Sequence, residues 1–181
     1  MFSDLGYTPT VHSDPLFDFS IPEDKETFDM LSTEQQAAVK DAPAETIVVD
    51  VPGKSEHTMA LMAHYDSATV EADENGHQHI TDGTSLGAAD DGYGVAAIVE
   101  TLRALKAEGR QPENSLKIVI TDAEEIGLVG ARNEMRHHRA DYENVDLVLN
   151  LEARGTSGPA LMFETSANNS AVAGYFLSHV K

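Results

Sequence analysis

The chain has 181 residues, of which 41% are hydrophobic, so it is long enough and apolar enough for one globular domain and is not a disordered protein. It carries 31 Asp and Glu residues against 12 Lys and Arg residues, and the resulting net charge of -19 disfavours binding to nucleic acid or to anionic membranes. The absence of cysteine excludes disulfides and thiolate metal ligands, so any metal ion must be held by oxygen and imidazole.

The first 45 residues are polar and acidic, and we interpret residues 1–45 as an N-terminal segment that contains the first strand and an insertion. A strand-like stretch covers residues 7–12 of this segment. A helix is predicted over residues 32–40, because Ser32 followed by Glu34 and Gln35 is typical of a helix N-cap. Nothing here indicates chemistry, and we expect the main domain at residues 46–181.

Short apolar runs rich in Val, Ile and Leu follow, as expected for strands that are buried on both faces. They cover residues 46–51, 58–63, 116–121, 145–151 and 160–163. Helical patterns lie between and after them, at residues 94–107, 128–138 and from residue 170 to the end. The polar stretch 67–86 is expected to be a long loop. This alternation predicts an α/β fold, a three-layer sandwich around a mostly parallel central sheet.

Acidic side chains and one histidine come directly after these strands or just before the central helix. They are His64 and Asp66 after residues 58–63, Glu124 and Glu125 after 116–121, Glu152 after 145–151, and Asp90 before 94–107. Sites in open α/β sheets form at the carboxyl ends of the strands, so we expect these groups to meet on one rim. Crowded carboxylates repel one another unless a cation is present, which predicts a divalent metal site.

The spacing of these residues suggests separate roles. His64 and Asp66 share one face of a strand, where Asp66 can accept the second ring N–H of His64. Asp90 can approach two ions and bridge them, and of the adjacent Glu124 and Glu125 one can bind metal while the other accepts a proton. Taken singly, the acids at helix starts also fit N-caps or partners of the helix dipole, so the metal prediction depends on the joint pattern.

Four stretches resemble metallopeptidase family twenty-eight, the di-zinc aminopeptidases. The resemblance is strongest to its membrane-associated branch, which is related to endoplasmic reticulum metallopeptidases and vacuolar membrane proteases. The stretches are LMAHYDS (61–67), GAADDGYGVAAIVETLRAL (87–105), IVITDAEEIGLVGAR (118–132) and LVLNLEARGTSG (147–158). They span about the last two-thirds of the chain. The resemblance implies an α/β fold of the zinc-peptidase (phosphorylase/hydrolase-like) type.

The resemblance also implies four metal ligands. His64 and Glu152 would bind one zinc, Asp90 would bridge to a second zinc, and Glu125 would bind that second zinc. Glu152 stands where secreted members usually have Asp, and the membrane-associated branch has Glu there. By the same resemblance Glu124 is the general base. Asp66 would be the residue that orients His64.

One ligand of the family has no match in this chain. The family's last ligand is a histidine for the second zinc, many tens of residues after the Glu152 position. The only later histidine here is His179, inside a predicted helix, and we do not assign it that role. His137 and His138 are expected at a helix C-terminus and are also left out of the site. We therefore expect a partial catalytic domain, incomplete at its C-terminal end, that holds one zinc or fewer where the intact domain holds two.

The implied function is that of a zinc-dependent exopeptidase, an aminopeptidase that hydrolyses N-terminal residues from peptides through a metal-activated water. Its partner would be a peptide substrate with a free N-terminus. The chain as given is expected to be inactive, and the parent protein to be extracytoplasmic or membrane-associated. Two alternatives stay open, a non-catalytic peptidase-like binding domain and a single-zinc enzyme similar to glutaminyl cyclase. The matching ligand positions and base favour hydrolysis.

Overall fold

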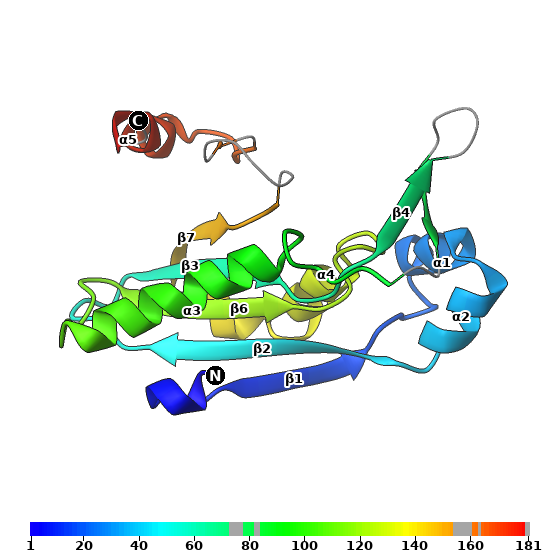
Figure 1. Cartoon of the computed structure of the whole chain (residues 1–181), viewed down its shortest axis with the longest axis horizontal. Coiled ribbons are helices and arrows are strands. Elements are labelled where there is room, and N and C mark those ends of the chain that lie inside the picture. The colour runs from blue at the N-terminus through cyan, green and yellow to red at the C-terminus, as the bar shows by residue number, and fades with distance from the viewer. Residues whose placement is uncertain (73–77, 82–83, 154–160, 163, 180–181) are drawn as a thin grey trace.

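The structure, a computed structural model, describes residues 1–72, 78–81, 84–153, 161–162 and 164–179 (Figure 1). Its helical elements are η1 (Ser3–Leu5), α1 (Pro22–Met30), α2 (Thr33–Val39), α3 (Gly92–Ala107), α4 (Val129–His137), η2 (Arg139–Tyr142) and α5 (Ser170–His179). Its strands are β1 (Thr10–Pro15), β2 (Pro43–Val51), β3 (Thr58–His64), β4 (Thr69–Ala72), β5 (Gln78–Thr81), β6 (Ser115–Thr121) and β7 (Val145–Asn150).

Five strands form the central sheet in the order β1-β2-β6-β3-β7. β3 pairs in parallel with β6 and β7, whereas β2 pairs antiparallel with both β1 and β6. The predicted α/β fold is confirmed, and β2 is the strand of this sheet that runs against its neighbours. Because β6, β3 and β7 are parallel, their carboxyl ends lie at the same edge of the sheet, where the acidic residues follow.

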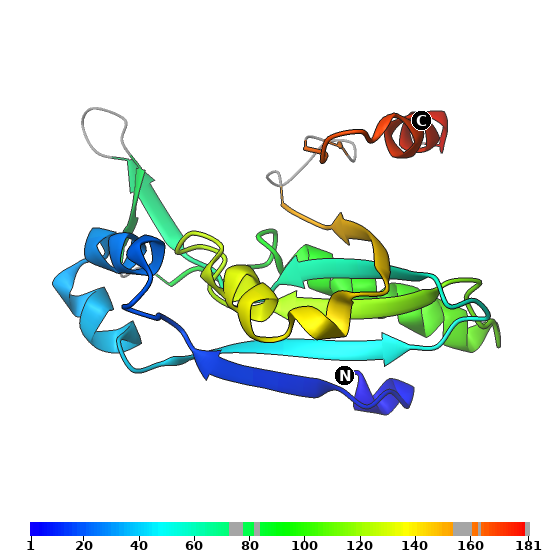
Figure 2. The same ribbon diagram turned by 180° about the vertical axis from the view of Figure 1, so that it is seen from behind.

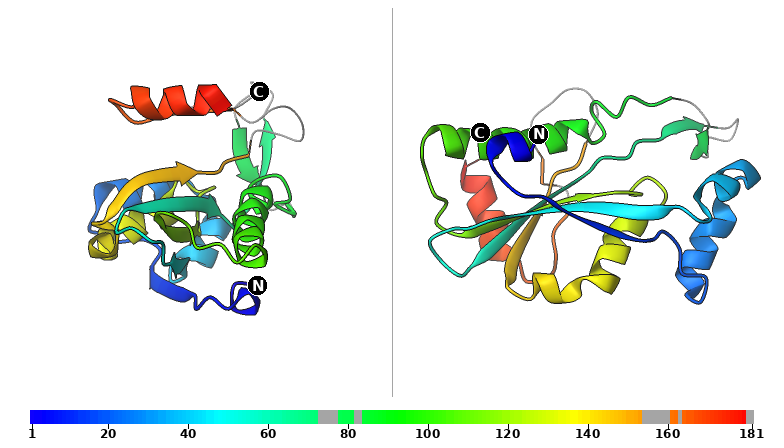
Figure 3. Two further views of the ribbon diagram at one scale, coloured as in Figure 1. Left: turned by 90° about the vertical axis from the view of Figure 1, so that its left-hand side faces the viewer. Right: turned by 90° about the horizontal axis from the view of Figure 1, so that it is seen from below.

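Helices cover both faces of the sheet, with α3 on one side and α4 on the other (Figure 3). The apolar residues of α3 recur at three- and four-residue spacing and form one stripe that faces the sheet. Ile98 and Leu102 of this stripe belong to the same buried cluster as Val49 of β2 and Ile118 of β6. Full burial of side chains of this size contributes about 1.5–3 kcal/mol each, so this cluster is the main source of stability around the site.

α4 closes the opposite face with a second cluster of buried side chains that includes Leu16, Phe17 and Val129. The helix begins very close to the end of β6. A Cβ atom on Gly130 would lie 1.8 Å from the backbone oxygen of Asp122, so a glycine is required for this approach. α4 ends at His137 with His138 as its C-cap, as the sequence predicts.

The acidic N-terminal segment contains two α-helices, of which one was predicted. The predicted N-cap is confirmed, because Ser32 accepts a hydrogen bond from the N–H of Gln35 at 3.2 Å and donates its own N–H to the Gln35 side chain at 2.9 Å. The helix α1 was not predicted. It lies with α2 beside one end of the sheet (Figure 2). Its polar sequence lacks an apolar stripe, and it is held by an ion pair between Asp24 and Arg136 of α4 and by the packing of Phe28 on Phe17.

Two further segments, 67–86 and 160–163, differ from what the sequence predicts in their described parts. The segment 67–86, expected to be a loop, contains the β4–β5 hairpin, in which Thr69 pairs with Thr81 and Val70 with Ile80. These residues are β-branched, which favours strands even in a polar segment. The predicted strand at 160–163 lies partly outside the described residues, and its described part, residues 161–162, is not in a strand.

The C-terminal part of the described chain is the least covered. β7 pairs with β3 at the edge of the sheet, and its Leu147, Val148 and Leu149 are exposed. α5 lies apart from the sheet (Figures 1 and 2). Among the described residues, no helix combines the length and the apolar composition that crossing a lipid bilayer requires.

Candidate metal centre

Three parts of the chain bring His64, Asp90 and Glu152 together. His64 ends β3, Asp90 lies in the turn before α3, and Glu152 follows β7 by two residues. One ligand atom from each of the three lies within 4.8 Å of the others. The parallel pairing of β3 with β7 explains this, because it delivers both chain segments to the same edge of the sheet.

The imidazole of His64 is at the centre of this group and is 2% exposed. Its Nδ1 lies 3.0 Å from the backbone oxygen of Asp66 and 3.5 Å from the Asp66 carboxylate. Its Nε2 lies 2.9 Å from Asp90 Oδ1 and 3.5 Å from Glu152 Oε1. With Nδ1 donating to Asp66, Nε2 is the nitrogen that can face a metal ion.

The Asp66 carboxylate mainly positions the loop after β6. It accepts hydrogen bonds from the backbone N–H groups of Glu124 at 3.0 Å and Glu125 at 3.1 Å. Ala123 has a φ of +52°, a left-handed conformation that turns the backbone at this point. Burial tends to raise the pKa of Asp66, but the hydrogen bonds from His64 and from the two amides hold it below the usual value. Asp66 is therefore ionised and available to orient its neighbours.

Glu124 and Glu125 lie on this loop in different environments. Glu124 Oε2 is 3.9 Å from His64 Nε2, and burial raises the pKa of Glu124 above its usual value. Glu125 Oε1 accepts a hydrogen bond from the N–H of Ala68 at 3.1 Å. Burial, assisted by the negative charge of Asp90, raises the pKa of Glu125. Glu125 is thus beside the three-residue group but is not one of its members.

The acidic edge of the sheet at the carboxyl ends of β3, β6 and β7, which we call the rim, favours a bound cation. Burial alone lowers the pKa of His64, but the hydrogen bond to Asp66 and the negative charge of Glu124 outweigh it and raise this pKa from 6.5 to about 10. Asp91 caps α3 by accepting a hydrogen bond from Gly94 at 3.0 Å, and burial raises its pKa to about 6. Among the described residues, the buried Oδ2 of Asp91 has no hydrogen-bond partner. A divalent ion would compensate this concentration of negative charge.

The donor set fits zinc. One imidazole nitrogen and two carboxylate oxygens are ligands that zinc accepts where no thiolate is available. Three protein ligands from separate elements also leave a coordination position open, as in catalytic zinc sites.

The sequence prediction and the structure agree on the proximity of His64, Asp90 and Glu152, with Asp66, Glu124 and Glu125 around them. Their individual roles stay predictions. Asp90 and Asp91 also fitted an N-cap and a partner of the helix dipole in the sequence, and in the structure Asp91 is the N-cap of α3.

Comparison with known proteins identifies a matching family and several relatives. Residues 46–181 match the profile of Peptidase family M28. A vacuolar membrane protease of Lachancea thermotolerans is 31% identical over 148 residues, which are 81% of this chain and 13% of that protein. A vacuolar membrane protease of Schizosaccharomyces pombe is 33% identical over 134 residues, which are 73% of this chain and 14% of that protein. The chain therefore spans a small part of these relatives.

Solved structures share the fold at low sequence identity. A glutaminyl cyclase of Porphyromonas gingivalis superposes with a TM-score of 0.63 at 18% identity, covering 97% of this chain and 56% of that one. A leucine aminopeptidase precursor of Bacteroides thetaiotaomicron superposes with a TM-score of 0.60 at 21% identity, covering 87% and 52%. The resemblance read from the sequence is confirmed, and this chain belongs to Peptidase family M28, a family of zinc-dependent peptidases.

Proposed function

We propose that the protein carrying this chain is a zinc-dependent exopeptidase, an aminopeptidase that hydrolyses N-terminal residues from peptides. The observation that carries the proposal is the convergence of His64, Asp90 and Glu152 beside Glu124, a partly buried acid with a raised pKa. In this proposal residues 46–181 belong to the catalytic domain, and residues 1–45 add the edge strand β1 and the helices α1 and α2.

His64, Asp90 and Glu152 are the proposed ligands of the first zinc, and Asp90 with Glu125 offers ligands to a second. Bound zinc supplies Lewis acidity and lowers the pKa of a water molecule. Asp66 contributes by holding His64 through Nδ1, which leaves Nε2 directed at the acids. For the chain of 181 residues alone we propose one zinc at this rim and negligible turnover, because its described residues offer one three-ligand group there.

Glu124 is the proposed general base. Its side chain is 26% exposed, so a water molecule can reach it, and its backbone is held by Asp66. The raised pKa of Glu124 makes the carboxylate a stronger base at neutral pH, which suits proton transfer. It would take a proton from the attacking water and return it to the leaving amine.

The acidic rim supports a substrate with a free ammonium group. The net charge of -19 and the carboxylates around His64 attract the N-terminus of a peptide and repel anionic substrates. Because the relatives are described as vacuolar membrane proteases, we propose a membrane-associated parent protein.

The test is the Glu124→Gln variant of the complete protein that carries this chain. We expect hydrolysis of aminoacyl p-nitroanilides to fall about 100-fold or more, because general bases contribute about that factor, while zinc content measured by mass spectrometry stays unchanged. Glu113→Gln is the matched control, since Glu113 is 76% exposed at the other end of β6 and should leave turnover intact. Full turnover in Glu124→Gln would show that the base is another group.

A single-zinc enzyme similar to glutaminyl cyclase is the second candidate. The observation in its favour is that the described rim residues form one three-ligand group and not two. Peptides that begin with glutamine separate the two proposals. An aminopeptidase releases free glutamine from them, whereas a cyclase releases ammonia and leaves a pyroglutamyl peptide.

A further inference from the structure

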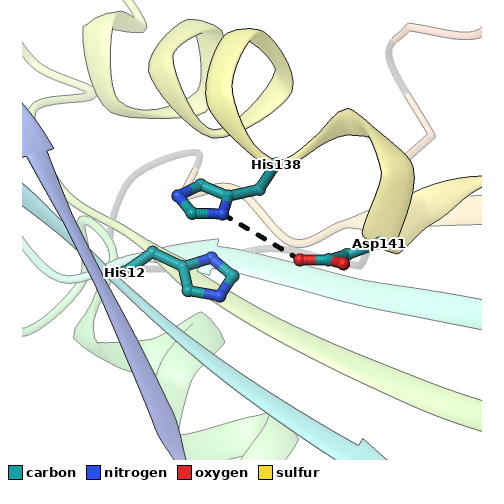
Figure 4. A group of neighbouring side chains, drawn as sticks. All are labelled: His12, His138 and Asp141. Carbon is teal, nitrogen blue, oxygen red and sulfur yellow. Dashed lines mark ion pairs between the residues drawn. The ribbon is translucent and has the colours of Figure 1, made fainter.

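A second cluster of ligand-type side chains lies away from the rim. His12 of β1, His138 at the end of α4 and Asp141 of η2 each place one ligand atom within 4.8 Å of the others (Figure 4). Asp141 also lines a hollow together with Thr58 and Val145, the first residues of β3 and β7. His12 lies on β1, whereas His64 ends β3, and the strands β2 and β6 lie between these two strands in the sheet.

One ring nitrogen of each imidazole in this cluster lies against a carboxylate, and the other nitrogen is left for a ligand. His12 Nδ1 lies 2.8 Å from Glu134 Oε1, and His138 Nε2 lies 2.8 Å from Asp14 Oδ2. Glu134 is 2% exposed and also accepts a hydrogen bond from the Tyr142 hydroxyl at 2.6 Å. Metal-binding histidines are held in this way, with one ring nitrogen on a carboxylate and the other on the ion. His12 Nε2 and His138 Nδ1 are the nitrogens left for a metal.

The charge of the cluster also suits a cation. Asp14, Glu134 and Asp141 surround the two imidazoles, and in the described part of the chain the ion-pair partners of Asp14 and Glu134 are these histidines. The C-terminus of α4 adds the negative end of a helix dipole at His138. Neutral imidazoles, which are the form that binds metal, would leave three carboxylates uncompensated.

The third ligand is within reach. His138 Nδ1 lies 3.9 Å from Asp141 Oδ2, and the Asp141 side chain is 53% exposed, so it can move toward an ion without unpacking the core. The two rings are stacked, with centroids 3.7 Å apart and planes 13° from parallel. Lone pairs of stacked rings point along parallel planes, so one ring must rotate for both nitrogens to meet the same ion. Metal binding and the stack therefore exclude each other.

We propose that His12, His138 and Asp141 form a second metal site that binds a divalent transition ion such as zinc and is independent of the catalytic rim. Imidazole and carboxylate together suit zinc and neighbouring first-row ions, and three protein ligands leave room for water. The ion would connect β1, from the acidic N-terminal segment, to the end of α4. The metal content of the chain would then exceed the count expected from the rim ligands alone.

The test is a zinc titration of the 181-residue chain, followed by native mass spectrometry and calorimetry. Asp141→Asn and His138→Gln should each bind one zinc fewer per chain than the wild type. His57→Gln is the matched control, because His57 is also paired with a carboxylate, Asp146 at 2.8 Å, but belongs to neither ligand group. Equal stoichiometry in the wild type, Asp141→Asn and His138→Gln would overturn the proposal.

A second measurement keeps the test decisive if one of the variants misfolds. If His138→Gln fails to fold, the exposed Asp141→Asn variant decides the outcome. Nuclear magnetic resonance of the imidazole nitrogens adds a local readout, because zinc should shift the signals of His12 and His138 and remove the ring-current effect of their stack. Zinc-bound protein with unchanged His12 and His138 signals would contradict the site.

Discussion

At the scale of the single residue, metal binding at the rim depends on the protonation of His64. The pKa of about 10 means that the metal-free imidazole carries a proton on each nitrogen at neutral pH. One proton faces Asp66, and the other lies on Nε2, the nitrogen that a metal ion needs. Protons and zinc therefore compete for the same atom.

This competition predicts the direction of the pH dependence. Below a pKa of about 10 each zinc that binds must displace one proton, so the zinc affinity of the rim should rise as the pH rises. The expected slope is about tenfold per pH unit between neutral pH and that pKa. Competition with a chelator at several pH values measures it, with Asp141→Asn as the background so that only the rim binds. A zinc affinity independent of pH would contradict the protonated state of His64.

The positions of the rim residues could be predicted from the sequence because they follow parallel strands. His64 and Glu152 meet for that reason. The finer contacts could not be predicted. Asp66 meets His64 most closely through its backbone oxygen, and its carboxylate binds two backbone amides. That arrangement depends on the left-handed turn at Ala123, which no spacing rule indicates for an alanine.

At the scale of the element, a buried ion pair helps to attach α1 to the domain, beside the packing of Phe28 on Phe17. Asp24 is 1% exposed and forms two hydrogen bonds with Arg136, at 2.8 and 3.2 Å. It also accepts the N–H of Asp18 at 2.9 Å. Although burial tends to raise the pKa of Asp24, these hydrogen bonds and the charge of Arg136 keep it below 3.8.

Removing the cation should therefore be costly. We expect Arg136→Met to lower the free energy of unfolding by up to about 5 kcal/mol at pH 7, because the buried Asp24 charge loses both direct hydrogen bonds and keeps the 3.9 Å ion pair with Arg132. Lys25→Met is the matched control in α1, since the Lys25–Asp29 pair is exposed, and it should cost at most about 1 kcal/mol. Urea unfolding measures both variants.

The effect should also depend on pH in a defined direction. A carboxylate with a lowered pKa contributes stability above its unfolded value of 3.8, and this contribution is lost as the pH falls through the folded value. The difference between wild type and Arg136→Met should therefore shrink below that pH. Equal losses for Arg136→Met and Lys25→Met at pH 7 would contradict a role for the buried pair.

Elements with a clear apolar pattern were predicted correctly, α2 was predicted from its N-cap, and the elements with neither signal were not predicted. α3, β3 and β6 have apolar patterns that bury one stripe or two faces, which makes them visible in the sequence. α1 was missed because long-range contacts stabilise it, and those contacts leave no periodic signal. The β4–β5 hairpin was missed because its segment is polar and each strand has four residues.

At the scale of the whole molecule, the chain combines a covered half and an open half. β2, β6 and β3 lie between helices, whereas the two edge strands are more open, β1 with exposed or half-buried residues and β7 with exposed apolar side chains. The negative charge gathers in the first 90 residues, which hold 18 acids and 3 bases. The sequence predicted the fold class, and the structure adds that the rim receives acids from both halves of the chain, Asp66 and Asp90 from the first and Glu124, Glu125 and Glu152 from the second.

The central claim is that the rim of this sheet is a zinc centre. The most direct measurement is anomalous diffraction at the zinc edge from a crystal of the chain grown with zinc. We expect a peak about 2.0–2.2 Å from His64 Nε2 and from the carboxylates of Asp90 and Glu152, the distances that zinc requires. Zinc-replete crystals with no anomalous peak within bonding distance of these three residues would contradict it.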